Sequence, residues 1–239
     1  MKLDRWLFTF GKLSRREADK AISEGRVTVD GIVTIKPFLD VDEKKTILLD
    51  GALVQKTAME PVIMKLYKPR GVVVSKVDQR ACSSTVFDLL PKSETRWIYV
   101  GRLDIDSEGL LLLTNVGRIA HFLESPKTAL KREYMVKVFG HVDDSKLSAI
   151  QQGPNIKGIN YSACKISVLR QAEKQTWLKI VLTEGKNREI RILMDHIGLR
   201  VSRLIRTAYG PFTINNMKPG EIESIFCRAI SKINLFPLM

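Results

Sequence analysis

The sequence predicts an α+β protein, in which a small helix-and-hairpin domain precedes a larger domain built on a mixed, mostly antiparallel sheet. Two observations support this prediction. Apolar residues near the start of the chain recur at helical spacing, whereas later apolar runs are short and rich in β-branched residues. These short runs outnumber the helical segments, and many are joined as hairpins. A chain of 239 residues is long enough for one ordinary domain and a small one.

The small domain is predicted from two helices and a hairpin. The first helix has an apolar stripe at positions i, i+3, i+4 and i+7, made by Leu3, Trp6, Leu7 and Phe10. Residues 14–17 (SRRE) form a capping box that begins a second helix, and Gly25 ends that helix. Extended runs on both sides of Asp30–Gly31 predict a hairpin. We assign residues 1–48 to this domain and residues 49–60, which have weak periodicity, to a linker.

The larger domain, residues 61–239, alternates mainly between strands and turns. Strands are predicted at 62–67, 72–75, 98–100, 110–113, 134–139, 166–169, 177–182 and 201–205. Helical segments are predicted at 85–90, 118–123, 144–151 and 188–197. The unbroken apolar run at 110–113 is typical of a strand that is buried on both faces. The last thirty residues are expected to be mainly extended.

The composition points to a polyanionic partner. The chain carries a formal net charge of +13 and a sequence pI of about 9.7, and each Lys or Arg that meets a phosphate releases counterions. Three widely spaced cysteines and three scattered histidines indicate neither a disulfide framework nor a metal site. The first residues lack an unbroken apolar stretch, and the sequence contains no run of about 20 apolar residues. We therefore expect no signal peptide, no membrane span and reduced thiols in a cytoplasmic protein.

Basic residues gather around the predicted second helix of the small domain: Lys12, Arg15, Arg16, Lys20 and Arg26. Residues 3–7, 14–18 and 25–31 together resemble the RNA-binding domain typified by ribosomal small-subunit protein S-four, the alpha-L motif. The resemblance covers about residues 1–48 and implies that the second helix faces RNA. The alternative is a basic helical hairpin that only docks on the rest of the chain.

Three acids lie within five residues in the segment 101–115 (GRLDIDSEGLLLLTN), between two predicted strands. Asp104 and Asp106 suit a metal-binding Asp-x-Asp pair, but they also suit a solvated turn. The local spacing does not decide between these interpretations. Acids held at strand ends by a rigid sheet are well placed for catalysis.

The same segment resembles the catalytic loop of the RNA pseudouridine synthases related to RsuA and RluB. The resemblance implies that Asp104 is the essential carboxylate and that the reaction needs no metal and no cofactor. In that reaction the N-glycosidic bond of uridine breaks, the uracil turns, and a carbon–carbon bond forms between C5 and the sugar. Two roles stay open for the carboxylate, attack on C1′ of the sugar or removal of the C2′ proton.

Two further segments carry the resemblance. Residues 131–136 (KREYMV) are similar to a motif whose aromatic residue, here Tyr134, stacks on the target base; Arg132 stands where the family often has Lys. The alternative for Tyr134 is a strand residue packed in the core. Residues 184–191 (EGKNREIR) are similar to the last family motif, which implies that Lys186 pairs with Asp104. In that segment Glu189 replaces the usual Gln, and Ile192 follows it where many relatives have a second Arg.

Residues 186–206 form the densest basic stretch of the chain, with six Lys or Arg and two acids, and could contact phosphates. The expected RNA contacts there are Arg188, Arg191, Arg203 and Arg206. The resemblance also implies that Arg102 fills the space that the flipped base leaves; pairing with a nearby acid is the alternative. The turn 68–71 (KPRG) resembles a family turn that supports the site or touches the RNA backbone.

These features predict a monomeric enzyme that converts specific uridines to pseudouridine in a folded stem-loop of ribosomal RNA, without a cofactor. The resemblance extends over residues 1–223 and is greater for the RluB branch, which modifies large-subunit (23S) RNA, than for the RsuA branch, which modifies small-subunit (16S) RNA. Two other classes stay open. One is a non-catalytic RNA-binding or ribosome-assembly protein, and the other is a metal-dependent nuclease that uses Asp104, Asp106 and Glu108.

Overall fold

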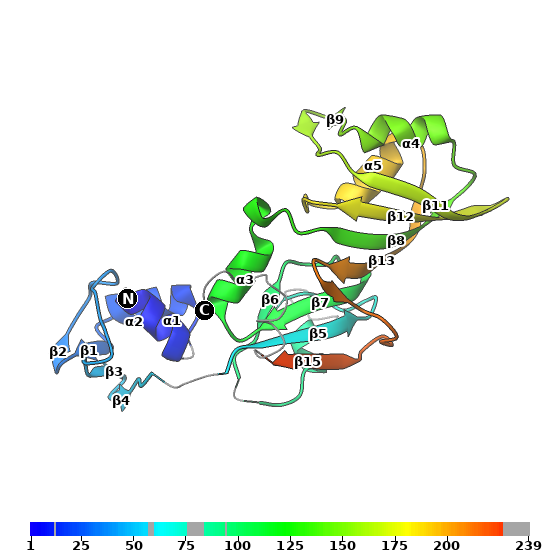
Figure 1. The fold of residues 1–239 in the computed structure, drawn as a ribbon. Helices are drawn as coiled ribbons and strands as arrows, with labels where there is room; N and C mark the ends of the chain where they lie inside the picture. The colour runs from blue at the N-terminus through cyan, green and yellow to red at the C-terminus, as the bar shows by residue number, and fades with distance from the viewer. Residues whose placement is uncertain (12, 57–59, 76–83, 94, 227–239) are drawn as a thin grey trace. The chain divides into compact units, whose positions relative to one another are not determined.

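The structure, a computed structural model, describes the chain except residues 12, 57–59, 76–83, 94 and 227–239 (Figure 1). The chain forms two compact units, Met1–Glu60 and Pro61–Met239. None of the helices in the described ranges combines the length and the apolar character needed to cross a membrane. The α+β class predicted from the sequence is confirmed.

The first unit begins with the two predicted helices, α1 (Leu3–Phe10) and α2 (Arg15–Ser23). The apolar stripe of α1 buries Leu3, Trp6 and Leu7 against the inner face of α2. The capping box before α2 is complete. The Ser14 amide donates to Oε2 of Glu17 at 2.5 Å, and the Glu17 amide donates to Oγ of Ser14 at 3.1 Å. These two bonds satisfy amides that the first helical turn leaves without a partner.

Four short strands complete the first unit: β1 (Val27–Val29), β2 (Ile32–Val33), β3 (Ile47–Leu49) and β4 (Ala52–Leu53), paired in the order β2-β1-β3-β4. The expected linker from residue 49 is wrong at its start, since β3 and β4 form a second hairpin. Asp50–Gly51 turns this hairpin with positive φ angles of 52° and 80°, as Asp30–Gly31 turns the first with 52° and 79°. The second Asp-Gly pair is therefore the sequence signal for this hairpin, although the residues around it have weak strand periodicity.

A nine-stranded sheet organises the second unit. Its strands are β5 (Val62–Lys68), β6 (Ile98–Val100), β7 (Glu108–Thr114), β8 (Arg132–Phe139), β11 (Lys165–Ala172), β12 (Gln175–Leu182), β13 (Val201–Tyr209), β14 (Phe212–Thr213) and β15 (Ile222–Phe226). The main order is β11-β12-β8-β13-β7-β5-β15, with β6 paired to β7 and β14 to β13. The β13–β7 pair is parallel and the other pairs of this sheet are antiparallel, which confirms the mixed, mostly antiparallel sheet.

Helices cover both faces of this sheet (Figure 1). The helices are α3 (Gly117–Glu124), α4 (Asp144–Gln151) and α5 (Glu189–His196), with 3-10 turns at Val86–Leu89 and Pro126–Thr128 and a separate small hairpin of β9 (Asn155–Ile156) and β10 (Ile159–Asn160). Leu111 and Leu113 of β7 belong to the hydrophobic core that includes α4 and α5. Leu110 and Leu112 pack in a second core with α3. The strand is thus buried on both faces, as its apolar run predicted.

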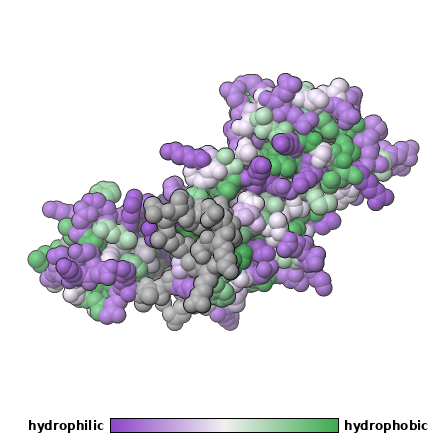
Figure 2. Space-filling view, viewed as in Figure 1, coloured by the Kyte–Doolittle hydropathy of each residue, from purple (hydrophilic) through white to green (hydrophobic). Residues whose placement is uncertain are grey.

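Two predictions for the second unit need correction or extension. Residues 72–75 form no strand; Val73 makes only an isolated bridge with Thr85. Strand β13 continues four residues beyond the predicted end, because it stays paired with β8 as far as Tyr209. In the extended final segment the structure shows β14 and β15, and residues 227–239 lie outside the described part. Hydrophilic side chains cover much of the visible surface of each unit, with smaller apolar areas between them (Figure 2).

Candidate active site

The loop between β6 and β7, residues 101–107, carries Asp104 and is held from the side of the 68–71 turn. The Lys68 ammonium donates to the Ser107 carbonyl at 2.7 Å, and the Gly71 amide donates to the Ile105 carbonyl at 2.7 Å. Lys68 is fully buried, and burial lowers the pKa of its ammonium to about 8 even though Asp106 and Asp104 act in the opposite direction. The turn therefore fixes the backbone on which Asp104 stands.

Asp104 faces a cavity of about 930 Å³ that also contains the other two predicted catalytic residues, Tyr134 and Lys186. Arg102 lies on the same wall as Asp104 and is exposed. The cavity is formed by the 101–107 loop, the start of β8 and the segment between β12 and α5. Three segments that are far apart in the sequence thus meet in one concave site, which is the usual setting for a ligand.

The position of Tyr134 shows core packing and leaves the base-stacking interpretation open. It alternates on β8 with outward residues and belongs to the same apolar cluster as Leu103, Leu182 and Leu204, so it is largely buried. It also lines the cavity. A ring that is fixed by packing on one side and open to a cavity on the other suits a flat base.

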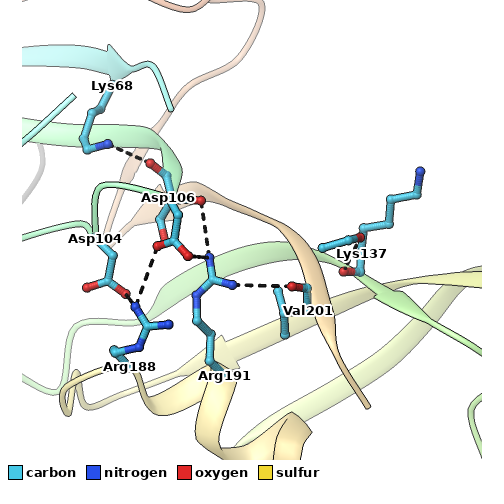
Figure 3. A network of polar contacts seen from close by, with 9 residues as sticks. Lys68, Asp104, Asp106, Lys137, Arg188, Arg191 and Val201 are labelled. Atoms are coloured by element: carbon cyan, nitrogen blue, oxygen red, sulfur yellow. Dashed lines mark hydrogen bonds and ion pairs between the residues drawn. The ribbon is translucent and has the colours of Figure 1, made fainter. Parts of the chain in front are cut away.

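Two arginines approach the acids of the loop from the α5 side (Figure 3). Nη1 of Arg188 lies 3.4 Å from Oδ2 of Asp104 and 3.8 Å from Oδ1 of Asp106. Nη2 of Arg191 lies 3.0 Å from Oδ2 of Asp106 and 3.3 Å from the Asp106 carbonyl. The two side chains therefore neutralise and orient both carboxylates.

The expected ion pair between Lys186 and Asp104 is not formed. The Lys186 ammonium pairs with Glu184 and lies 5.5 Å from the centre of the Tyr161 ring, and Arg188 takes the place beside Asp104. The backbone gives the reason. Arg188 adopts a left-handed conformation (φ 51°, ψ 27°) at the N-cap of α5. The hydrophobic pattern of the sequence does not predict this conformation.

Glu108, the third acid of the predicted group, is bound elsewhere. Arg203 holds it with a two-bond contact, Nε to Oε1 at 2.6 Å and Nη2 to Oε2 at 3.1 Å. The hydrogen bond from Arg203 is the largest influence on Glu108 and lowers the pKa of its carboxyl. In the part of the chain that the structure describes, no group of three His, Cys, Asp or Glu residues is arranged to hold a metal. The acids of this segment face guanidinium groups instead.

The expected RNA contacts of the 186–206 stretch divide into two groups. The side chains of Arg188 and Arg203 are almost half exposed. Arg206 is only 2% exposed and donates through Nε to the Leu110 carbonyl at 2.7 Å, so its expected phosphate contact is not supported. Arg191 is also largely buried. The exposed and the buried arginines carry the same charge. They differ in where each side chain lies on β13 or near the start of α5.

The basic residues of the first unit are exposed, but most have acidic neighbours. Arg15 pairs with the buried Asp4 at 2.9 Å, and Lys20 lies 3.6 Å from Glu24. Arg26 pairs with Asp50 at 2.5 Å. Within the described part of this unit Arg16 has no ion pair, and Lys12 lies outside the described residues.

Two residues, Arg132 and Glu184, support this site through contacts that the sequence did not predict. Arg132 is buried beside the cavity; it donates to the Tyr209 hydroxyl at 2.9 Å and to the Thr183 carbonyl at 3.0 Å. Glu184 binds the Lys186 ammonium and accepts from the Ser162 amide at 2.6 Å. A charged residue at an inward position of an alternating strand, such as Arg132 at the start of β8, is the signal that a buried polar contact exists.

Comparison with known proteins identifies the class to which this fold belongs. The family model described as RNA pseudouridylate synthase matches residues 62–196, more than half of the chain, and the S4 domain model matches residues 1–37. The protein belongs to the RNA pseudouridine synthase family and carries an S4 domain at its start.

The relatives extend this match over almost the whole chain. An uncharacterized RNA pseudouridine synthase of Rickettsia felis is 40% identical over 97% of this chain and 99% of its own length. The ribosomal large subunit pseudouridine synthase B of Yersinia pestis is 39% identical over 89% of this chain and 68% of its own length. A crystal structure of a pseudouridylate synthase has the same fold, with a TM-score of 0.68 and 23% identity, and the match covers 98% of this chain and 99% of that one.

Proposed function

We propose that this protein converts specific uridines of large-subunit ribosomal RNA to pseudouridine, with Asp104 as the catalytic carboxylate. The observation that supports this best is the position of Asp104, on a loop braced by Lys68 and Gly71 and facing the cavity that Tyr134 lines. The relatives from Yersinia pestis and Salmonella typhi, named for the large ribosomal subunit, support the choice of RNA.

The reaction is an isomerisation, so the chain must bind, flip and reattach the base without adding atoms. The N1–C1′ bond breaks, the uracil turns within the cavity, and C5 bonds to C1′; C5 loses its proton and N1 gains one. Asp104 acts either as a nucleophile at C1′ or as a base at C2′, and a carboxylate suits both roles. Arg188 holds it in a fixed direction at 3.4 Å.

The target base would stack on Tyr134, and Arg102 would fill the gap that the flipped base leaves in the RNA. Arg188 lines the cavity and Arg203 is exposed on β13, and both would contact phosphates, while Arg191 orients Asp106. In the first unit, Arg15, Arg16, Lys20 and Arg26 would contact a neighbouring part of the RNA. A folded stem-loop bound by one copy of the chain fits this division of contacts.

The test uses wild-type protein with separate transcripts of large- and small-subunit ribosomal RNA, in parallel reactions with and without EDTA, followed by mapping of pseudouridine and of strand cleavage. We expect pseudouridine at one or a few positions of the large-subunit transcript. Product in the small-subunit transcript alone would instead indicate the other branch of the family. No product in either transcript would refute the proposal, and strand cleavage that EDTA abolishes would indicate a nuclease.

The neighbours of Asp104 give a prediction about relative effects. Arg188→Met should lower the single-turnover rate by tenfold or more, on the order of what a misplaced catalytic group costs, because it removes the cation beside Asp104. Lys186→Met, in the same loop, should cost less, since its ammonium pairs with Glu184. Rates at saturating protein and RNA affinity are measured for both variants. A larger loss in Lys186→Met would show that Lys186 moves to Asp104 when RNA binds.

A further inference from the structure

Glu189 lies at the first position of α5 and ties down the segment that precedes this helix. Its side chain is 3% exposed. Oε2 accepts a hydrogen bond from the Lys186 amide at 2.9 Å, and the Glu189 amide donates to the Lys186 carbonyl at 3.2 Å. Oε1 of Glu189 is also buried but has no hydrogen-bond donor. An ionised carboxylate oxygen in such a position would be costly.

The Glu184 side chain is an acid that interacts with Glu189. The Glu184 carboxylate accepts from the Ser162 amide and the Lys186 ammonium, and it interacts with the side chain of Glu189. Two carboxylates that share a buried place cannot both ionise without strong repulsion. A single proton on Glu189, donated toward Glu184, gives Oε1 a partner and removes that repulsion. Glu189 then resembles a glutamine in shape and in hydrogen bonding.

The shifts in pKa agree with this distribution of the proton. Burial raises the pKa of Glu189 to about 7; the Lys186 amide opposes that change, and the charge of Glu184 adds to it. Burial also acts to raise the pKa of Glu184, but hydrogen bonds from Lys186 and the Ser162 amide outweigh it, and its pKa is lowered. Both directions favour a proton on Glu189 rather than on Glu184.

We propose that Glu189 is a positioning residue that works as the neutral acid, sharing one proton with Glu184 and thereby holding the 184–188 segment so that Arg188 faces Asp104. The proposal rests on the proposed function for its effect on the reaction. Ionisation of Glu189 would strengthen its bond from the Lys186 amide but place a second negative charge beside Glu184. Repulsion between the two carboxylates would then displace the 184–188 segment that they hold. Arg188, which follows this amide by two residues, would then lose its fixed place at 3.4 Å from Asp104.

The other groups around Glu189 do not replace it as the titrating acid. The cations of this region are Lys186, which pairs with Glu184, and Arg132, whose guanidinium lies beside Gly185. Tyr161 lies under the Lys186 ammonium. The thiol of Cys164 is buried, and burial together with Glu189 raises its pKa to about 11, far above the range that matters here.

The test compares single-turnover rates of pseudouridine formation between pH 6 and pH 9 for wild type, Glu189→Gln and Glu221→Gln. Glu221 is a matched control, because its exposed carboxylate accepts from the Lys218 amide at 2.7 Å with the same spacing. The wild-type and Glu221→Gln rates should fall above pH 7, approaching tenfold per pH unit as the proton is lost. Glu189→Gln should match wild type at pH 6 and stay level to pH 7.5, below the range near pH 8 in which Lys68, the brace of the catalytic loop, loses its own proton.

A second measurement needs no RNA and no activity. In full-length protein labelled with carbon-13 at the glutamate side-chain carboxyls, one NMR resonance should titrate near pH 7 in wild type and Glu221→Gln and be missing in Glu189→Gln. A Glu189→Gln variant that is folded but inactive at pH 6, or whose rate falls between pH 6 and pH 7.5 as the wild-type rate does, would overturn the proposal. So would the absence of a near-neutral resonance. Absence of pseudouridine at every pH with that resonance present would overturn the proposed function while supporting the shared proton.

Discussion

Replacing Asp104 with asparagine is expected to lower the single-turnover rate of pseudouridine formation by at least about a thousandfold, while affinity for RNA stays within about threefold of wild type. Asparagine keeps the shape of the side chain but can neither attack C1′ as an anion nor accept the C2′ proton. The backbone of the loop is held by Lys68 and Gly71, not by the Asp104 side chain, so the cavity should keep its form.

The matched control is Asp106→Asn, two residues along the same loop and equally exposed. Asp106 forms an ion pair with Arg191 at 3.0 Å. Its replacement should disturb the orientation of the loop and lower the single-turnover rate about tenfold. Rates are measured at saturating protein with mapped product, and affinity by titration of labelled RNA. If Asp104→Asn retained more than a tenth of the wild-type rate, or if Asp106→Asn lost more than Asp104→Asn, Asp104 would not be the catalytic carboxylate.

Most of the fold was predictable because its elements follow hydrophobic period and turn chemistry. The stripe of α1 and the capping box of α2 act within a few residues of sequence and needed no tertiary information. The predicted boundaries of α4 were confirmed for the same reason. The errors lie where long-range pairing decides. Residues 72–75 have strand composition but find only one bridge, and β13 extends to Tyr209 because β8 is there to pair with it.

The sequence predicted which residues lie near one another around Asp104 but not the contacts between them. The order of the three motifs predicted that Asp104, Tyr134 and Lys186 belong together, and the structure brings them to one cavity. The partner of Asp104 depends instead on the left-handed backbone of Arg188, which follows from how the segment after β12 enters α5. Burial of Arg206 likewise depends on the central position of β13 in the sheet.

The second large effect is expected at Gly109, where β7 leaves the catalytic loop. Its φ is +104°, and a Cβ placed there would lie 2.3 Å from the Arg206 carbonyl oxygen and 2.7 Å from the Arg206 nitrogen. Arg206 is its neighbour in the parallel β13–β7 pair, so both contacts are with backbone that cannot rotate away. Gly109→Ala should lower the free energy of unfolding by about 4 kcal/mol or more, the range of severe core substitutions.

Gly140→Ala is the control that separates two costs of Gly109→Ala, the steric clash of the new Cβ and the strain of a positive φ. Gly140 has a similar φ of +91°, but a Cβ there would meet nothing within 4 Å. Its replacement should cost about 1–2 kcal/mol from the angle alone, and the gain from a less flexible unfolded chain is the same for both variants. Urea unfolding of the full chain measures the free energy of unfolding of both variants.

Since β13 also carries Leu204 to the cavity, any folded Gly109→Ala protein should be slower in catalysis, whereas Gly140→Ala should keep the wild-type rate. Equal losses of stability in the two variants would show that β7 and β13 are not packed as closely as the distances at Gly109 require.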